Sequence, residues 1–250
     1  MACFGSVGGM DDWAEVRRRR VVYEDDAVLA LDKPVGISVM GERHETDLVR
    51  LAADAGEVLY PVHRIDKVTS GLVLLAKDLG VHGGLTRQFN ARTVEKGYLA
   101  VTRTTGLPEK GTIDLPLSVG RKNRVRIAAA RESIVEEDGV WTVPAGEVFT
   151  HVKNYPSVTE FTRVFQDGER TVLSLRPVSG RRHQIRVQLA WIGHPIEGDP
   201  LFEKVPAGRT FLHSWRLAVD AAWRGGGRMA LEAPPGADFW AAVDYAVQLP

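Results

Sequence analysis

The sequence has only one cysteine, Cys3, among its 250 residues. A single cysteine excludes a disulfide within the chain and a zinc site built on several cysteines. The sequence also lacks the roughly 18 continuous apolar residues of a membrane-spanning helix, and its N-terminus has no apolar signal-peptide segment. These absences predict a soluble protein of the reducing cytoplasm with no membrane partner.

The chain also lacks net charge, because 32 lysines and arginines balance 32 aspartates and glutamates. A global basic field is therefore excluded, and any site for nucleic acid must be a local patch. The positive charge is concentrated in three places, Arg17–Arg20, Arg121–Arg126 and the group Arg181, Arg182 and Arg186. We interpret Arg17–Arg20 as a solvated arm, because attraction to phosphate requires only charge.

The hydrophobic content of 44% is sufficient for a substantial core. We predict a flexible basic leader at residues 1–20 and one folded domain over residues 21–250, without internal repeats. Short apolar segments predict strands near residues 21–24, 27–31, 71–77, 94–103, 112–116, 123–128, 148–153, 158–166, 170–176, 210–217 and 228–232. Helices are predicted at residues 46–54, 79–91, 181–193 and 237–248, and a long loop at residues 130–147.

Two segments about 115 residues apart carry side chains suited to chemistry. Asp66 stands between Arg64 and Lys67 on the loop before a buried strand, and the flanking cations favour its ionised form. In the second segment, Gly180–Arg186, several donors are predicted on the first turns of a helix, where arginine can pair with a carboxylate or a phosphate. Without further information, an aspartate in a basic loop is more often a surface ion pair.

The segment His63–Lys77 resembles the His-Arg-Leu-Asp-x-x-Thr-Ser-Gly-Leu-Leu-Leu-Leu-Ala-Lys signature of the RluA-type pseudouridine synthase family. Leu31–Gly36 is similar to the Asn-Lys-Pro-x-Gly element of that family, and Lys96–Ala100 to its Lys-x-Tyr-x-Ala element. Pro177–Val187 resembles its Pro-x-Thr-Gly-Arg-Thr-His-Gln-Ile-Arg-Val element. Four motifs in the family's order are much harder to match by chance than one.

The resemblance implies an α+β fold with a central mixed, mainly antiparallel sheet flanked by helices, in two sub-domains around a cleft. It implies an enzyme that isomerises specific uridines of ribosomal or transfer RNA to pseudouridine by base flipping. Such an isomerisation needs no cofactor and no metal. We expect no separate S4-type RNA-binding domain, and therefore expect a monomer that recognises an RNA stem-loop through the catalytic domain itself.

The resemblance also assigns roles to individual residues. Asp66 attacks or deprotonates the target uridine, Tyr98 stacks on its base, and Arg186 pairs with the aspartate. Arg64 fills the space that the flipped nucleotide leaves. Further contacts with RNA are expected from Lys67, Arg181, Arg182 and His183. The sequence departs from the family pattern at Asp32, Val68, Arg182 and Gln188, which puts the identity of the substrate in doubt more than the activity.

Two alternatives remain open at this stage. A non-catalytic RNA-binding protein of the same fold would keep the cleft and lose turnover. A carboxylate-dependent hydrolase would use Asp66 together with Glu197 or Asp199 and would need that second carboxylate. We do not expect a metal triad of His63, His183 and His194, and we interpret Trp191, Trp215 and Trp240 as core residues.

Overall fold

The computed structural model describes residues 12–41, 46–204 and 208–243. Twelve strands form one sheet, in which β4 pairs with β14 and β6 with β10 in parallel and all other described pairs are antiparallel. The main path runs through β1 (Val21–Glu24), β2 (Val28–Lys33), β4 (Ser70–Ala76), β14 (Leu212–Asp220), β5 (Glu95–Thr102), β13 (Thr171–Pro177), β12 (Val158–Gln166), β6 (Lys110–Asp114), β10 (Val140–Thr142) and β9 (Val135–Glu137). Off this path, β15 (Arg228–Glu232) pairs with β14, and β3 (Tyr60–Pro61) with β4. The predicted mixed, mainly antiparallel sheet is confirmed.

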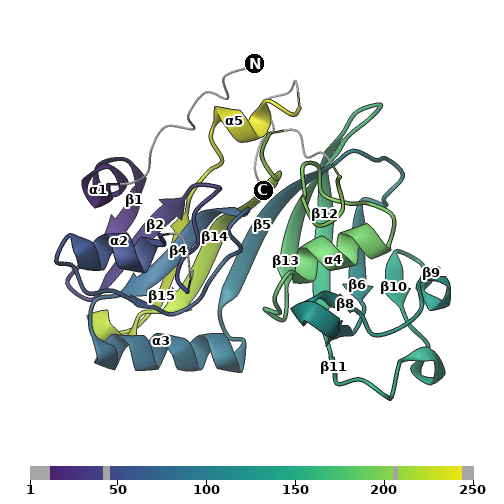
Figure 1. Cartoon of the computed structure of the whole chain (residues 1–250), viewed down its shortest axis with the longest axis horizontal. Coiled ribbons are helices and arrows are strands. Elements are labelled where there is room, and N and C mark those ends of the chain that lie inside the picture. Colours follow the sequence, from purple (N-terminus) through teal and green to yellow (C-terminus); the bar gives the residue numbers. More distant parts are fainter. Residues whose placement is uncertain (1–11, 42–45, 205–207, 244–250) are drawn as a thin grey trace.

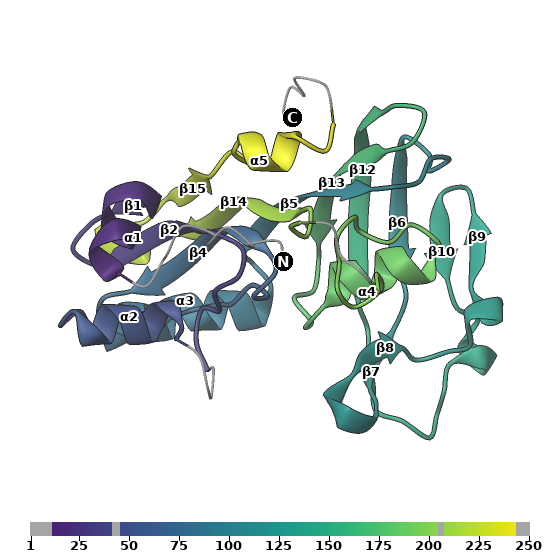
Figure 2. The ribbon, with the colours of Figure 1, turned by 45° about the horizontal axis from the view of Figure 1, so that its top comes forward.

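The sheet has two halves that meet at β14 and β5 (Figure 1). The first half carries α1 (Trp13–Arg20), α2 (Leu48–Asp54) and α3 (Leu79–Ala91), and the second half carries α4 (Gln184–Trp191) (Figure 2). A small second sheet of β11 (Asn154–Tyr155), β7 (Leu117–Val119) and β8 (Val125–Ile127) belongs to the second half. The short helix α5 (Ala237–Trp240) follows β15. None of the described helices is long and apolar enough to span a membrane.

Separate hydrophobic cores explain the continuous apolar strands of the first half. Leu29 and Leu31 of β2 pack with α1 and α2, whereas Val28 and Ala30 pack on the opposite face with α3 and β15. Since successive residues of a strand point to opposite faces, a strand buried on both faces must be apolar throughout. A third core fills the second half, between the sheet and α4.

Most of the predicted elements are present, some with identical bounds, but three predictions are wrong. Residues 148–153 form no strand, and the nearest one is β11. The loop predicted at residues 130–147 contains the hairpin of β9 and β10, whose Asp138-Gly139 turn has positive φ at both residues. An Asp-Gly pair favours this two-residue hairpin turn. The C-terminal helix ends at Trp240, and residues 244–248 of that prediction lie outside the described residues.

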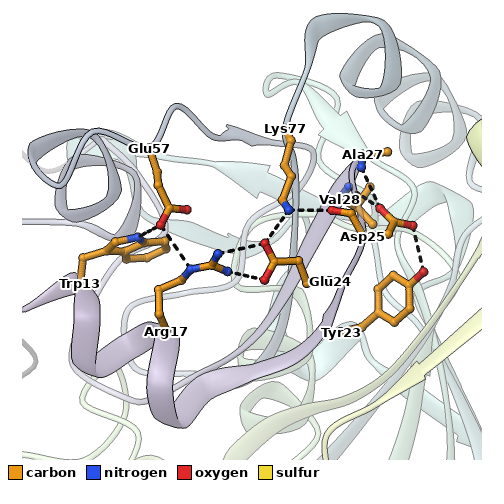
Figure 3. A network of polar contacts seen from close by, with 9 residues as sticks. All are labelled: Trp13, Arg17, Tyr23, Glu24, Asp25, Ala27, Val28, Glu57 and Lys77. Atoms are coloured by element: carbon orange, nitrogen blue, oxygen red, sulfur yellow. Dashed lines mark hydrogen bonds and ion pairs between the residues drawn. The ribbon is translucent and has the colours of Figure 1, made fainter.

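The leader predicted at residues 1–20 is wrong for its second part, since Trp13–Arg20 form α1, whereas residues 1–11 lie outside the described residues. Trp13 and Val16 are buried against the first half. The indole Nε1 of Trp13 donates to Glu57 Oε1 at 2.7 Å, and Asp12 caps the helix by accepting from the Ala14 amide at 3.0 Å (Figure 3). An amphipathic turn with a buried tryptophan is therefore part of the folded domain.

The arginines of this helix are not a solvated arm. Arg17 donates two hydrogen bonds to Glu24, at 2.6 and 2.9 Å, and also lies 3.2 Å from Glu57 (Figure 3). Arg17, followed by Lys77, lowers the pKa of Glu24 to about 2. The other three arginines of the run are paired as well, Arg18 and Arg19 with Glu15 and Arg20 with Asp32. Their charges are compensated within the protein.

The two halves of the sheet approach most closely at Gly71. β4 pairs with β14 there, in register Ser214 with Gly71, and Gly71 has φ +105°. A Cβ atom at this position would lie 2.1 Å from the backbone oxygen of Ser214. Only glycine permits both the backbone angle and the close approach of the strands.

We expect Gly71→Ala to lower the free energy of unfolding by about 2–4 kcal/mol, because overlap with the backbone adds to the strain of the positive φ. Gly56→Ala is the matched control, since Gly56 has a similar φ of +86° but no atom within 4 Å of the added Cβ. This control should cost only about 1 kcal/mol. Urea unfolding of the three proteins measures both values, and equal losses for the two variants would contradict the steric explanation.

Candidate active site

A cleft with a volume of about 520 Å³ lies where the two halves meet. One wall comes from the loop before β4 and from the end of α3, and the opposite wall from the segment between β13 and α4. The strand β5 contributes Lys96 and Tyr98. The charged and polar lining residues include His63, Arg64, Asp66, Arg92, Arg181, Arg182, His183 and Arg186.

Arg186 connects two carboxylates at the base of this cleft. Its Nη1 donates to Asp66 Oδ2 at 2.8 Å, while Nε and Nη2 donate to the two oxygens of Asp199 at 2.8 and 2.6 Å. The Asp199 side chain is fully buried and that of Arg186 is 4% exposed, whereas Asp66 retains 20% exposure toward the cleft. The two-pronged pair with Asp199 fixes the guanidinium plane, so that its third donor is held at Asp66.

Charge and burial act against each other at Arg186. Burial lowers the pKa of this guanidinium, but hydrogen bonds and charges from Asp199 and Asp66 outweigh burial and raise the pKa above its ordinary value. Arg186 therefore remains a cation beside Asp66 and supports its ionised form.

The backbone of the Asp66 loop is held from below by a buried lysine. Lys33, which is fully buried, donates from Nζ to the carbonyl oxygens of Pro34 at 2.7 Å, Ile37 at 2.8 Å and Lys67 at 3.4 Å. Burial lowers the pKa of Lys33 to about 7, although the nearby charge of Asp66 acts in the opposite direction. The Lys-Pro-x-Gly element thus ties its own turn to the loop that carries Asp66.

Tyr98 is half-buried at the junction of the two halves. It packs against the core of each half and also lines the cleft, so its role as a core residue and its place at the site coexist. Burial raises the pKa of Tyr98 to about 12, despite a hydrogen bond with Ser214. The phenol therefore keeps its proton at neutral pH.

The helix α4 begins later than predicted, at Gln184, because His183 adopts the left-handed conformation with φ +56°. A left-handed residue cannot continue a right-handed helix. Arg181 and Arg182 consequently lie on a loop before the helix. Gln184 holds this loop by accepting from Ser179 Oγ at 2.7 Å and from the Arg181 amide at 3.1 Å.

His183 lies beside the carboxylate of Asp66, with Nε2 3.7 Å from Oδ1. Burial lowers the pKa of His183, although the charge of Asp66 opposes this shift. The imidazole is therefore neutral at pH 7, and the contact is a polar one rather than a pair of opposite charges.

Four of the five residues predicted to contact RNA line the cleft, namely Arg64, Arg181, Arg182 and His183, whereas Lys67 does not. Two cations were missed, Arg92 and Lys96. Lys96 lies two residues before Tyr98 on the same strand, which places both side chains on one face. That spacing is a signal visible in the sequence, but Arg92, at the left-handed end of α3, has none.

Neither acidic residue proposed for a hydrolase is available in the cleft. Both oxygens of Asp199 accept from Arg186, and Glu197 is buried in ion pairs with Arg103 and Arg170. The described residues contain no group of histidine, cysteine, aspartate or glutamate side chains able to hold a metal ion. His63 accepts from the Leu74 amide at 3.0 Å. The three tryptophans considered at first, Trp191, Trp215 and Trp240, belong to the core of the second half.

Comparisons with known proteins agree with this geometry. The family described as RNA pseudouridylate synthase matches residues 27–191. The chain is 34% identical over 217 residues to the dual-specificity RNA pseudouridine synthase RluA of Vibrio parahaemolyticus, covering 83% of this chain and 78% of the relative. It is 34% identical over 188 residues to the mitochondrial tRNA pseudouridine(32) synthase of Saccharomyces cerevisiae, covering 73% and 37%. The solved structure of human RNA pseudouridylate synthase domain containing 4 has a TM-score of 0.70 at 22% identity and covers 90% of this chain and 92% of that one, which is a similarity of fold.

Proposed function

This chain belongs to the RNA pseudouridylate synthase family, and we propose that it isomerises specific uridines of ribosomal or transfer RNA in the cleft around Asp66. The observation that carries the proposal is the grip of Arg186 on Asp66, at 2.8 Å inside a cleft where Asp66 stays accessible. An ionised carboxylate held in one position by a buried cation is ready to act as a nucleophile or a base. Asp66 attacks or deprotonates the target nucleotide.

The reaction balances without a co-reactant. The bond between N1 of uracil and C1′ of ribose breaks, the uracil turns, and a bond forms between C5 and C1′. The proton that leaves C5 goes to water, and N1 gains a proton. No electron is gained or lost, so the isomerisation needs neither a redox cofactor nor a metal.

Tyr98 supplies the aromatic face for the flipped uracil. A uridine taken out of its stack loses a few kcal/mol, which stacking on an aromatic side chain offsets in part. Because the pKa of Tyr98 is about 12, its phenolate is scarce at neutral pH. This favours stacking over removal of the C5 proton as the contribution of Tyr98.

Arg64, exposed at the edge of the cleft, is suited to fill the place that the flipped nucleotide leaves. Such a replacement lowers the cost of opening the RNA. We further propose that the chain acts as a cytoplasmic monomer on an RNA stem-loop, whose unpaired bases are the easiest to flip. The name of the Vibrio relative, dual-specificity, and that of the yeast relative, a tRNA synthase, support both RNA classes as substrates.

Release of tritium tests this function directly. Unmodified ribosomal and transfer RNA transcripts that contain 5-tritiated uridine should lose label to water when the chain is added, since the C5 proton leaves. Transcripts with 6-tritiated uridine are the matched control and should keep their label, because the bond at C6 stays intact. RNA binding without any release from 5-tritiated RNA would instead support the non-catalytic alternative. Mapping pseudouridines in cells that lack the gene then identifies the target.

A further inference from the structure

A surface beside the cleft gathers cations that the catalytic site does not use. We call this surface, with its aromatic residue Tyr155, the basic platform. Its members come from the turn after β7, from β8, from the residue before β11 and from the loop before α4. The cations are Arg121, Lys122, Arg124, Arg126, Lys153, Arg181 and Arg182, and all seven are exposed.

Printed contacts join this surface to the cleft. Arg181 and Arg182 line the cleft, and the guanidinium of Arg182 donates to the backbone oxygen of Asn123, within the basic turn. The guanidinium carbon of Arg181 lies 5.1 Å from the centre of the Tyr155 ring, and Nζ of Lys153 lies 5.4 Å from it. The platform therefore begins at the edge of the cleft and continues onto the small sheet.

The charge of the platform is not compensated. In the described part of the chain, none of its seven cations forms an ion pair with a carboxylate within 4 Å. The arginines of α1, by contrast, all have acidic partners. Since the whole chain is neutral, this contrast concentrates the positive field next to the cleft.

Tyr155 positions two of these cations. Its ring has Lys153 and Arg181 as cation–π neighbours, which restricts two long side chains that would otherwise move freely. Its own backbone is fixed in the small sheet, where Tyr155 pairs with Leu117 and Leu117 with Ile127. The cations on this sheet are thus presented from a rigid base.

We propose that the basic platform binds the phosphates of the RNA strand that leaves the cleft, next to the target uridine. This inference rests on the proposed function, because a nucleotide seated at Asp66 places its neighbours near Arg181 and Arg182. Phosphates at regular spacing match a row of unpaired cations, and such contacts position the RNA without reading its sequence. The platform adds Arg121, Lys122, Arg124, Arg126 and Lys153 to the RNA surface.

The test compares two double variants that remove the same charge. Arg121→Ala with Arg124→Ala removes two platform cations, and Arg18→Ala with Arg19→Ala removes two exposed arginines of α1. Binding of a fluorescein-labelled RNA hairpin with a uridine-containing loop is followed by anisotropy over a salt series. The platform variant should bind at least about tenfold more weakly at low salt and lose about 0.7–0.9 of the salt slope per phosphate contact. The α1 variant should match the wild type.

Turnover separates this inference from the proposed function. At saturating RNA, the platform variant should release tritium at the wild-type kcat with a raised KM. Equal binding and salt slopes for the platform variant and the wild type would overturn the platform while leaving the activity intact. Loss of hairpin binding without any tritium release by the wild type would reject the proposed function and keep the platform. Failure of the wild type to bind the hairpin, or displacement of the hairpin by polyglutamate far beyond the effect of its ionic strength, would overturn the platform.

Discussion

Asp66→Asn should abolish tritium release, slowing turnover by about four orders of magnitude or more, as removal of a catalytic nucleophile typically does. Asparagine has the shape of aspartate, and its oxygen can still accept from Arg186 at the 2.8 Å position. It has no negative charge, so it can neither attack nor deprotonate the nucleotide. Single-turnover tritium release measures the loss, and hairpin anisotropy checks that RNA still binds.

Two control variants make this result specific. Asp238→Asn changes an exposed carboxylate that pairs with Arg209 outside the cleft, and it should retain the wild-type rate. Glu197→Gln separates the synthase from the hydrolase, since the hydrolase needs a second carboxylate and the synthase does not. Wild-type turnover in Asp66→Asn would reject Asp66 as the catalytic residue. Equal losses in the Asp66 and Glu197 variants would favour the two-carboxylate alternative.

The site could be predicted from the sequence where a motif holds residues together. The resemblance implied that Arg186 pairs with Asp66, and the two residues, 120 positions apart, form that hydrogen bond. Tyr98 lines the same cleft. Their catalytic roles stay predictions. The buried strands and α3 were predicted because their apolar patterns are local properties of the sequence.

Contacts between distant segments could not be predicted in the same way. The arginines of α1 are indistinguishable from a solvated arm until the chain brings Glu24 and Glu57 to Arg17. Asp199 drew attention only as a partner for hydrolysis, because nothing in its local sequence shows that both its oxygens hold Arg186. In each case the tertiary structure, rather than local propensity, decides what a charged residue does.

The buried pair of Arg186 and Asp199 should therefore govern both stability and activity. We expect Asp199→Leu to lower the free energy of unfolding by about 3–5 kcal/mol, because it leaves a buried guanidinium without its main partner. The variant should also lose turnover, since Arg186 is no longer held in the plane that reaches Asp66. Asp199→Asn should be intermediate, because its side chain accepts from only one of the two donors.

A double variant separates the two effects. Arg186→Met with Asp199→Leu replaces a buried ion pair by apolar side chains, which is often neutral or stabilising, so most of the unfolding free energy should return. Turnover should remain absent, because Asp66 has lost the cation that holds it. Urea unfolding and tritium release on the same preparations measure both quantities. Recovery of stability and activity together would mean that Arg186 acts only through the fold, whereas recovery of stability alone assigns it a direct effect on Asp66.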